Sequence, residues 1–267
     1  HAATCVCYSP DGKNIAAATT QETTIVMNTK GVLLNTFRHT EDVRTVSYSP
    51  NGSLLAAGDE ASRLILWEAK AGKEVLSFDH DSDVGRAIFS IDGNYLATAD
   101  QTGTVIIRKT NLVELSAGNV AMDIFAQYKI YSEFGRPAIA WSSDSKLVAL
   151  GGGTETQGKV IVRKLNNPNY VKEITEKKIV WCLAFSSDNQ LLSVGMFSNS
   201  EEDTRSGTIV VRKVESLEII YATFPSCGQA VVAMSFSYDS QLIAAGVMLD
   251  DGEKGAVQVY NMESKKI

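Results

Sequence analysis

The stretch that decides the fold is YSPNGSLLAAG at residues 48–58, where an aromatic residue and a serine lead into a turn and an apolar run follows. Proline fixes φ for the first corner of such a turn, an Asn or Asp side chain closes it, and glycine accepts the positive φ that comes next. Small residues at the end of the run let neighbouring sheets approach. The stretch therefore predicts two adjacent β-strands joined by a tight turn.

This pattern recurs along the chain at intervals of roughly 40 to 50 residues, close to the period of a propeller blade. The six copies begin at Tyr8, Tyr48, Phe89, Trp141, Phe185 and Phe236. A third, alternating strand follows each of the last five copies, and clear fourth strands lie at residues 32–37, 74–78 and 218–224. A repeat of strands alone is typical of four-stranded propeller blades and excludes a helical solenoid.

The last three copies differ from the first three at the glycine. Ser145, Asn189 and Ser240 occupy that position. Asn tolerates the left-handed region, whereas Ser enters it less readily. We therefore expect a slightly different turn where serine replaces glycine.

These repeats resemble the WD-repeat family over nearly the whole chain. His39 and His80 precede a new strand, where that family has its Gly-His pair, and Trp67 stands where it has its Trp-Asp pair. The family commonly joins this His to a Ser or Thr on the second strand, an Asp in the next turn and the Trp. The resemblance therefore implies structural roles for His39, Trp67 and His80.

The chain departs from that network in both blades that carry the histidine. Ala57 and Ala61 fall in the Ser/Thr and Asp positions of the second blade. In the third blade Thr98 matches, but Thr102 and Arg108 stand in the Asp and Trp positions. We expect no blade to carry the complete network.

Arginine occupies the Trp position in three successive blades, at Arg108, Arg163 and Arg212. One interpretation is a basic stripe that grips phosphate or an acidic peptide. The other is that each stem packs on its blade while the guanidinium pairs with a carboxylate or carbonyl. Because one arginine per blade would not readily converge on a ligand, we favour the second interpretation.

The whole pattern predicts an all-β fold, a β-propeller with six recognisable four-stranded WD-type blades in one domain spanning residues 1–267. We expect the blades at about residues 1–39, 40–80, 81–134, 135–177, 178–226 and 227–267. Residues 112–134 are expected to hold a loop and then a strand, with a short helix as the alternative. The last seven residues, 261–267, make a poor fourth strand. We thus expect a sixth blade that is three-stranded or completed from outside this chain, which would be part of a longer protein that could hold a seventh blade.

Composition limits the classes of function. A net charge of −6 disfavours a general nucleic-acid binder, which needs a basic surface. No run of residues is long and apolar enough for a membrane helix. The four cysteines lack the Cys-x-x-Cys spacing, so we expect reduced thiols rather than a disulfide or a metal site. We expect a cytoplasmic protein without membrane contact.

No spacing in the chain indicates a catalytic centre. His39 and His80 recur at the repeat period, and a catalytic base is needed only once. The expected first strands also begin with mainly apolar residues, where a propeller enzyme would need polar groups. We therefore expect no enzyme activity, no catalytic or metal site, no cofactor and no small-molecule substrate.

Acidic residues gather in connections that share one face of a propeller, those between strands two and three and those between successive blades. We expect long loops of the first kind at residues 152–159, 196–207 and 247–255. Candidate partner-binding residues in these connections are Glu201, Glu202, Asp203, Asp250, Asp251, Asp42 and Asp83. We expect a protein-interaction scaffold that binds a basic partner within a larger assembly. The alternatives are a nucleic-acid or phosphopeptide reader and a propeller enzyme with a central-channel site.

Overall fold

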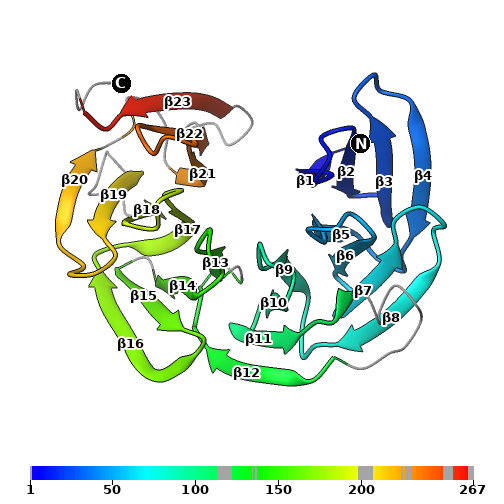
Figure 1. Ribbon diagram of the computed structural model, residues 1–267, viewed down its shortest axis with the longest axis horizontal. Helices are drawn as coiled ribbons and strands as arrows, with labels where there is room; N and C mark the ends of the chain where they lie inside the picture. Colours follow the sequence, from blue (N-terminus) through cyan, green and yellow to red (C-terminus); the bar gives the residue numbers. More distant parts are fainter. Residues whose placement is uncertain are drawn as a thin grey trace. The chain divides into compact units, whose positions relative to one another are not determined.

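A computed structural model describes residues 2–112, 122–133, 135, 137–154, 156–197, 207–223, 225, 230–248 and 255–263. The chain divides into two compact units (Figure 1). The first contains residues 1–129 and 134–136, and the second contains residues 130–133 and 137–267. Consecutive antiparallel sheets make up both units.

The first unit holds three four-stranded sheets, each with its strands paired in chain order. The first sheet consists of β1 (Ala3–Tyr8), β2 (Asn14–Thr19), β3 (Thr23–Asn28) and β4 (Leu33–Arg38). The second consists of β5 (Val43–Tyr48), β6 (Leu54–Asp59), β7 (Arg63–Glu68) and β8 (Glu74–Asp79). The third consists of β9 (Val84–Phe89), β10 (Tyr95–Asp100), β11 (Thr104–Lys109) and β12 (Ile124–Lys129).

The second unit continues the pattern. Its first sheet consists of β13 (Ala138–Trp141), β14 (Leu147–Thr154), β15 (Gln157–Lys164) and β16 (Asn167–Glu176). The next contains β17 (Ile179–Phe185), β18 (Leu191–Phe197), β19 (Thr208–Lys213) and β20 (Ile219–Thr223). The last contains β21 (Ala230–Phe236), β22 (Leu242–Met248) and β23 (Gly255–Asn261), and the pairing of Phe197 with Ala230 links it to β18.

The sixth sheet has three strands among the residues described. Met262 and Glu263 form a turn after β23, and residues 264–267 lie outside the described part of the chain. In each of the five earlier sheets a fourth strand pairs with the third. The sixth sheet therefore differs from the others at β23, which pairs with no fourth strand among the described residues.

The Ser turn between the first and second strands is the same in all six sheets. In each copy the serine Oγ donates to the Asp or Asn side chain two residues later, for example from Ser49 to Asn51 Oδ1 at 2.7 Å. The expectation of a different turn at serine is wrong. Ser145 and Ser240 adopt φ values of 56° and 60°, close to the 71° of Gly52. The surrounding hydrogen bonds hold serine in the left-handed region that it usually avoids.

Two predicted loops have different outcomes. The long connection expected at residues 152–159 is shorter than predicted, because the two strands of the hairpin extend into it and pair Gly152 with Lys159 and Thr154 with Gln157. Between the third and fourth sheets, the expected strand is β12, and the preceding residues 113–121 lie outside those described.

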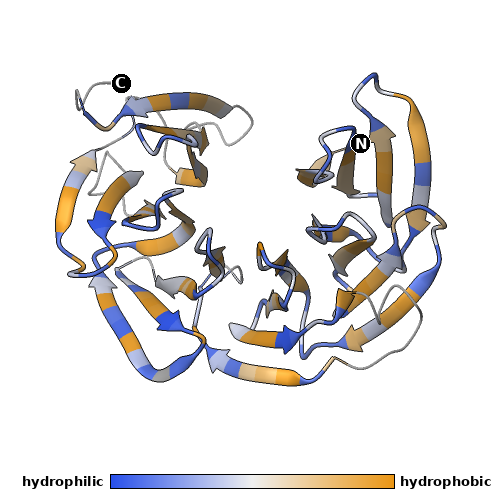
Figure 2. Ribbon diagram, in the orientation of Figure 1, coloured by the Kyte–Doolittle hydropathy of each residue, from blue (hydrophilic) through white to orange (hydrophobic). Residues whose placement is uncertain are grey.

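Apolar side chains pack between successive sheets of each unit. One cluster joins the first and second sheets through Phe37, Val46, Leu55 and Trp67. Further clusters join the second sheet to the third, and β13–β15 to β17–β19. Figure 2 shows hydrophilic and hydrophobic segments mixed along the fourth strands, such as β8 and β12, which form one edge of their sheets. The repeat thus buries one apolar layer per pair of neighbouring sheets.

Candidate functional site

A buried polar cluster joins the first two sheets at the end of β4. His39 Nδ1 lies 3.2 Å from Asp59 Oδ2, and its Nε2 lies 3.2 Å from Thr24 Oγ1. The side chains of His39 and Asp59 are completely buried. Asp59 Oδ1 also accepts a hydrogen bond from the backbone N–H of Arg63, which closes the turn after β6. These buried polar groups have no contact with water, so breaking one of their hydrogen bonds would leave a buried group unpaired. The cluster therefore fixes the position of the connection between the two sheets.

The acidic member of this cluster differs from the one that the sequence predicted. Asp59 lies at the end of β6, two residues before the predicted position, Ala61. Asp100 takes the same place at the end of β10, two residues before Thr102, which holds the position predicted for the acid. Each of these aspartates follows the serine of its Ser turn by ten residues, so the repeat itself carried the signal.

The third sheet varies this cluster. His80 Nδ1 lies 3.5 Å from Asp100 Oδ2, beyond good hydrogen-bond geometry. Burial lowers the pKa of His80, although the Asp100 carboxylate opposes that shift. Arg108, in the Trp position, places its guanidinium carbon 4.1 Å from the centre of the Phe78 ring. In this sheet a cation–π contact therefore replaces the packing of a tryptophan.

Comparison with known families supports the repeat assignment. The family model described as WD domain, G-beta repeat matches residues 31–68, 72–108 and 169–209. Each match contains all or most of the fourth strand of one sheet and all or part of the first three strands of the next. The chain belongs to the WD-repeat family. Its fold class is the all-β WD-type propeller, its sheets are WD blades, and His39 and Asp59 lie within one WD repeat.

An ion pair joins the fourth and fifth blades of this WD-repeat protein. Arg212 in the fifth blade donates from Nε to Glu176 Oε1 at 2.9 Å and from Nη1 to the Leu217 carbonyl at 2.8 Å. Glu176 belongs to β16 of the fourth blade, and burial raises the pKa of its carboxyl while Arg212 opposes the shift. Arg212 thus pairs with a carboxylate and a carbonyl, as the second interpretation of the arginines predicted. Arg108 does not, because its Nε and Nη1 are buried without a hydrogen-bond partner among the described residues.

The predicted partner-binding residues are only partly described. Asp42 and Asp83 occupy equivalent positions, because their backbone carbonyls accept hydrogen bonds from Glu60 and Gln101 at 3.0 Å. Both side chains are partly exposed, and Asp83 Oδ2 accepts a hydrogen bond from Gln101 Nε2 at 2.7 Å. The other five candidates, Glu201, Glu202, Asp203, Asp250 and Asp251, lie outside the described residues.

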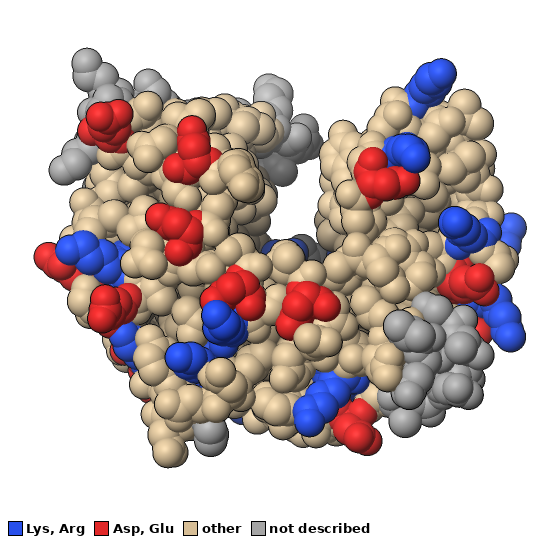
Figure 3. Space-filling view, viewed as in Figure 1, with Lys and Arg blue, Asp and Glu red and all other residues tan. Residues whose placement is uncertain are grey.

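Charges on the face seen in Figure 3 are mixed, with acidic and basic side chains interspersed over each unit. Within the described part of the chain, His, Cys, Asp and Glu form no group of three that could hold a metal ion. Across the same residues, no helix has the length and apolar character needed to cross a membrane.

Proposed function

We propose that this WD-repeat protein is a non-catalytic scaffold that binds a basic protein partner through the acidic connections between strands two and three and between successive blades. WD repeats generally mediate protein–protein interactions, and WD propellers typically lack catalysis. The observation that carries the proposal is the repetition of Asp42 and Asp83, which project from equivalent, rigidly bonded connections one blade apart. Loops on a rigid scaffold are where binding residues concentrate.

The electrostatic part of the proposal follows from charge balance near those connections. Arg44, which follows Asp42 and Val43, is paired with Glu60, so its positive charge is largely compensated. Asp42 and Asp83 take part in no ion pair within the described part of the chain, and their negative charge would attract a basic surface. We place the protein inside the cell as part of the same proposal, since Cys5, Cys7 and Cys182 form no disulfide among the described residues.

Quantitative affinity purification from the native cell tests the proposal. The wild-type chain should recover at least one partner with a basic surface. A variant with Glu201→Gln, Glu202→Gln, Asp203→Asn, Asp250→Asn and Asp251→Asn should recover it poorly. The matched control neutralises five acids outside these connections, Glu68, Glu74, Asp123, Glu215 and Glu263. Equal loss in both variants, or no loss in either, would contradict the proposal.

A further inference from the structure

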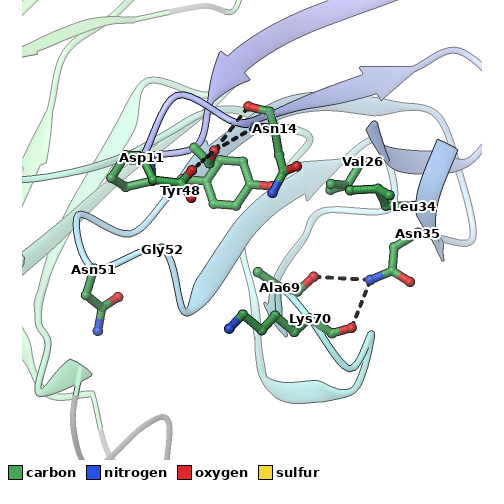
Figure 4. Close-up of a pocket in the computed structure, with 12 residues that line it drawn as sticks. Asp11, Asn14, Val26, Leu34, Asn35, Tyr48, Asn51, Gly52, Ala69 and Lys70 are labelled. Carbon is green, nitrogen blue, oxygen red and sulfur yellow. Dashed lines mark hydrogen bonds between the residues drawn. The ribbon is translucent and has the colours of Figure 1, made fainter. Parts of the chain in front are cut away.

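A cavity of about 470 Å³ opens between the first and second blades. The Ser turns of these two blades form one side of it, and the turn after β7 forms another. Figure 4 shows Asn14 and Tyr48 together on one side, Val26 and Leu34 on a second side, and Lys70, next to Ala69, on a third. The cavity therefore has both an apolar wall and a polar wall, and it falls in the size range of ligand sites.

The repeat supplies an internal comparison, because the second and third blades meet through equivalent residues. Ser9 N donates to the Asn14 carbonyl just as Ser49 N donates to the Leu54 carbonyl, at 2.8 and 2.9 Å. Asn35 pairs with Val26 as Leu76 pairs with Leu66. Tyr48 and Phe89 both end the first strand of their blades.

Between the second and third blades, these positions form a filled apolar cluster. It contains Leu54, Leu66, Leu76, Phe89 and Leu112. Between the first and second blades, the corresponding residues are Asn14, Val26, Asn35, Tyr48 and Ala71. Three polar substitutions and two smaller side chains thus turn a packed interface into an open cavity.

The turn glycines show the same difference in filling. A Cβ atom on Gly93 would lie 2.6 Å from Leu112 Cδ1. A Cβ atom on Gly52, the equivalent residue of the second blade, would meet nothing nearer than Pro10 Cδ at 3.5 Å. Asn14 is also exceptional in the whole chain, because the same position in the other five blades holds Leu54, Tyr95, Leu147, Leu191 and Leu242.

Several polar groups around the cavity have no partner among the residues that the structure describes. Tyr48 is 9% exposed, and its hydroxyl makes no hydrogen bond within the described chain. Burial raises the pKa of Tyr48 to about 12, so the hydroxyl stays protonated and able to donate. The Asn14 side-chain amide and the exposed Lys70 ammonium likewise have no hydrogen-bond or ion-pair partner among the described residues. Asn35, by contrast, donates to the Ala69 and Lys70 carbonyls at 3.2 and 3.0 Å and only shapes the wall.

The unpaired groups favour a ligand rich in acceptors. Tyr48, Asn14 and Lys70 supply donors of three kinds, while the nearby Asp11 Oδ1 already accepts from Ser9 Oγ and from the backbone N–H of Lys13. Asp11 Oδ2 lies 3.7 Å from Lys13 Nζ, and this exposed ion pair offsets part of its charge. A carboxylate would satisfy the donors, and an apolar side chain would cover Val26 and Leu34.

We propose that this cavity binds a short peptide segment of a partner protein, in which a carboxylate lies beside an apolar side chain. The carboxylate, from Asp, Glu or a chain terminus, contacts Asn14 and Tyr48, and the positive charge of Lys70 attracts it from another side of the cavity. The apolar side chain contacts Val26 and Leu34. This site is separate from the acidic connections and does not depend on the basic partner proposed for them.

Selection from a library of short random peptides with free carboxyl termini tests the proposal. The library is selected on the full chain and counter-selected on the Asn14→Leu variant, which restores the residue type of four other blades. We expect the enriched peptides to carry a carboxylate beside an apolar residue. Fluorescence polarisation should show binding about tenfold weaker to Asn14→Leu and to Lys70→Glu, and a smaller loss for Tyr48→Phe.

Lys30→Glu is the matched control. Thr29 N and Ala69 N make the same hydrogen bond to the turn of their own blade, so Lys30 is the equivalent of Lys70 one blade earlier, away from the cavity. Lys30→Glu should leave the peptide affinity unchanged, and all variants should have the melting temperature of the wild type. The proposal is overturned if no peptide discriminates against Asn14→Leu. An equal loss of peptide affinity in Lys30→Glu would also overturn the proposal. So would an unchanged affinity when the carboxylate of the peptide is replaced by an amide.

Discussion

Replacing Trp67 by alanine should lower the free energy of unfolding by about 3–5 kcal/mol, the cost of removing a large buried aromatic side chain. Trp67 is 9% exposed and belongs to the apolar cluster between the first and second blades. Its ring centre lies 5.6 Å from that of Phe37 and 5.7 Å from that of His39, so the cavity left by alanine would border both blades. Equilibrium unfolding in urea, followed by circular dichroism, measures the loss.

Trp67→Phe is the matched control. The indole Nε1 is buried without a hydrogen-bond partner in the described structure, so phenylalanine loses part of the ring volume but no hydrogen bond. We expect it to cost less than about 2 kcal/mol, because removing an unpaired donor offsets part of the lost packing. A loss below about 1 kcal/mol for Trp67→Ala, or equal losses for both variants, would refute the reasoning.

Asp59→Ala should destabilise the protein by about 3 kcal/mol in the same assay, because His39 and the Arg63 N–H lose their buried acceptor, and a change within error would contradict that role. Burial holds the pKa of His80 below its usual value. As the pH falls below about 6.5, the unfolded chain therefore binds a proton that the folded chain does not, and stability falls. His80→Asn should flatten this fall, as measured by unfolding at several pH values, and an unchanged slope would exclude His80 as its source. Burial also raises the pKa of Cys7 to about 12, so alkylation at about pH 8, followed by peptide mass spectrometry, should modify Cys7 only in denaturant.

The repeat made most of the fold predictable. The Ser turn recurs with one hydrogen-bond pattern, and strands follow it at fixed offsets, so the copies beginning at Tyr8 and Phe236 could be placed as securely as the one at Tyr48. Serine at Ser145 seemed to require another turn, but the local hydrogen bonds outweigh its backbone preference. The connection at residues 152–159 is predicted to be long, yet Gly153 and Gly158 pair across the hairpin, because glycine can be accommodated inside a strand.

The polar clusters were less predictable. The family resemblance places the acid beside His39 inside the turn, at the position of Ala61, but Asp59 reaches the histidine from the end of β6. The cavity depends on Asn14 and Asn35, which lie on different strands, and only the register of β2, β3 and β4 shows that both border one space. Alignment of the six copies does show Asn14 in a position that otherwise holds large, mainly apolar residues. This difference among the six copies is the sequence signal that points to the cavity.

The most direct test of the account is the association rate of the wild-type chain with the basic partner recovered by affinity purification, measured over a range of ionic strength. If the acidic connections bind that partner, the rate should fall steeply as salt screens the attraction. The variant neutralised at Glu201, Glu202, Asp203, Asp250 and Asp251 should associate more slowly at low salt and depend less on salt. An association rate at low salt that is the same for the wild type and this variant would contradict the account.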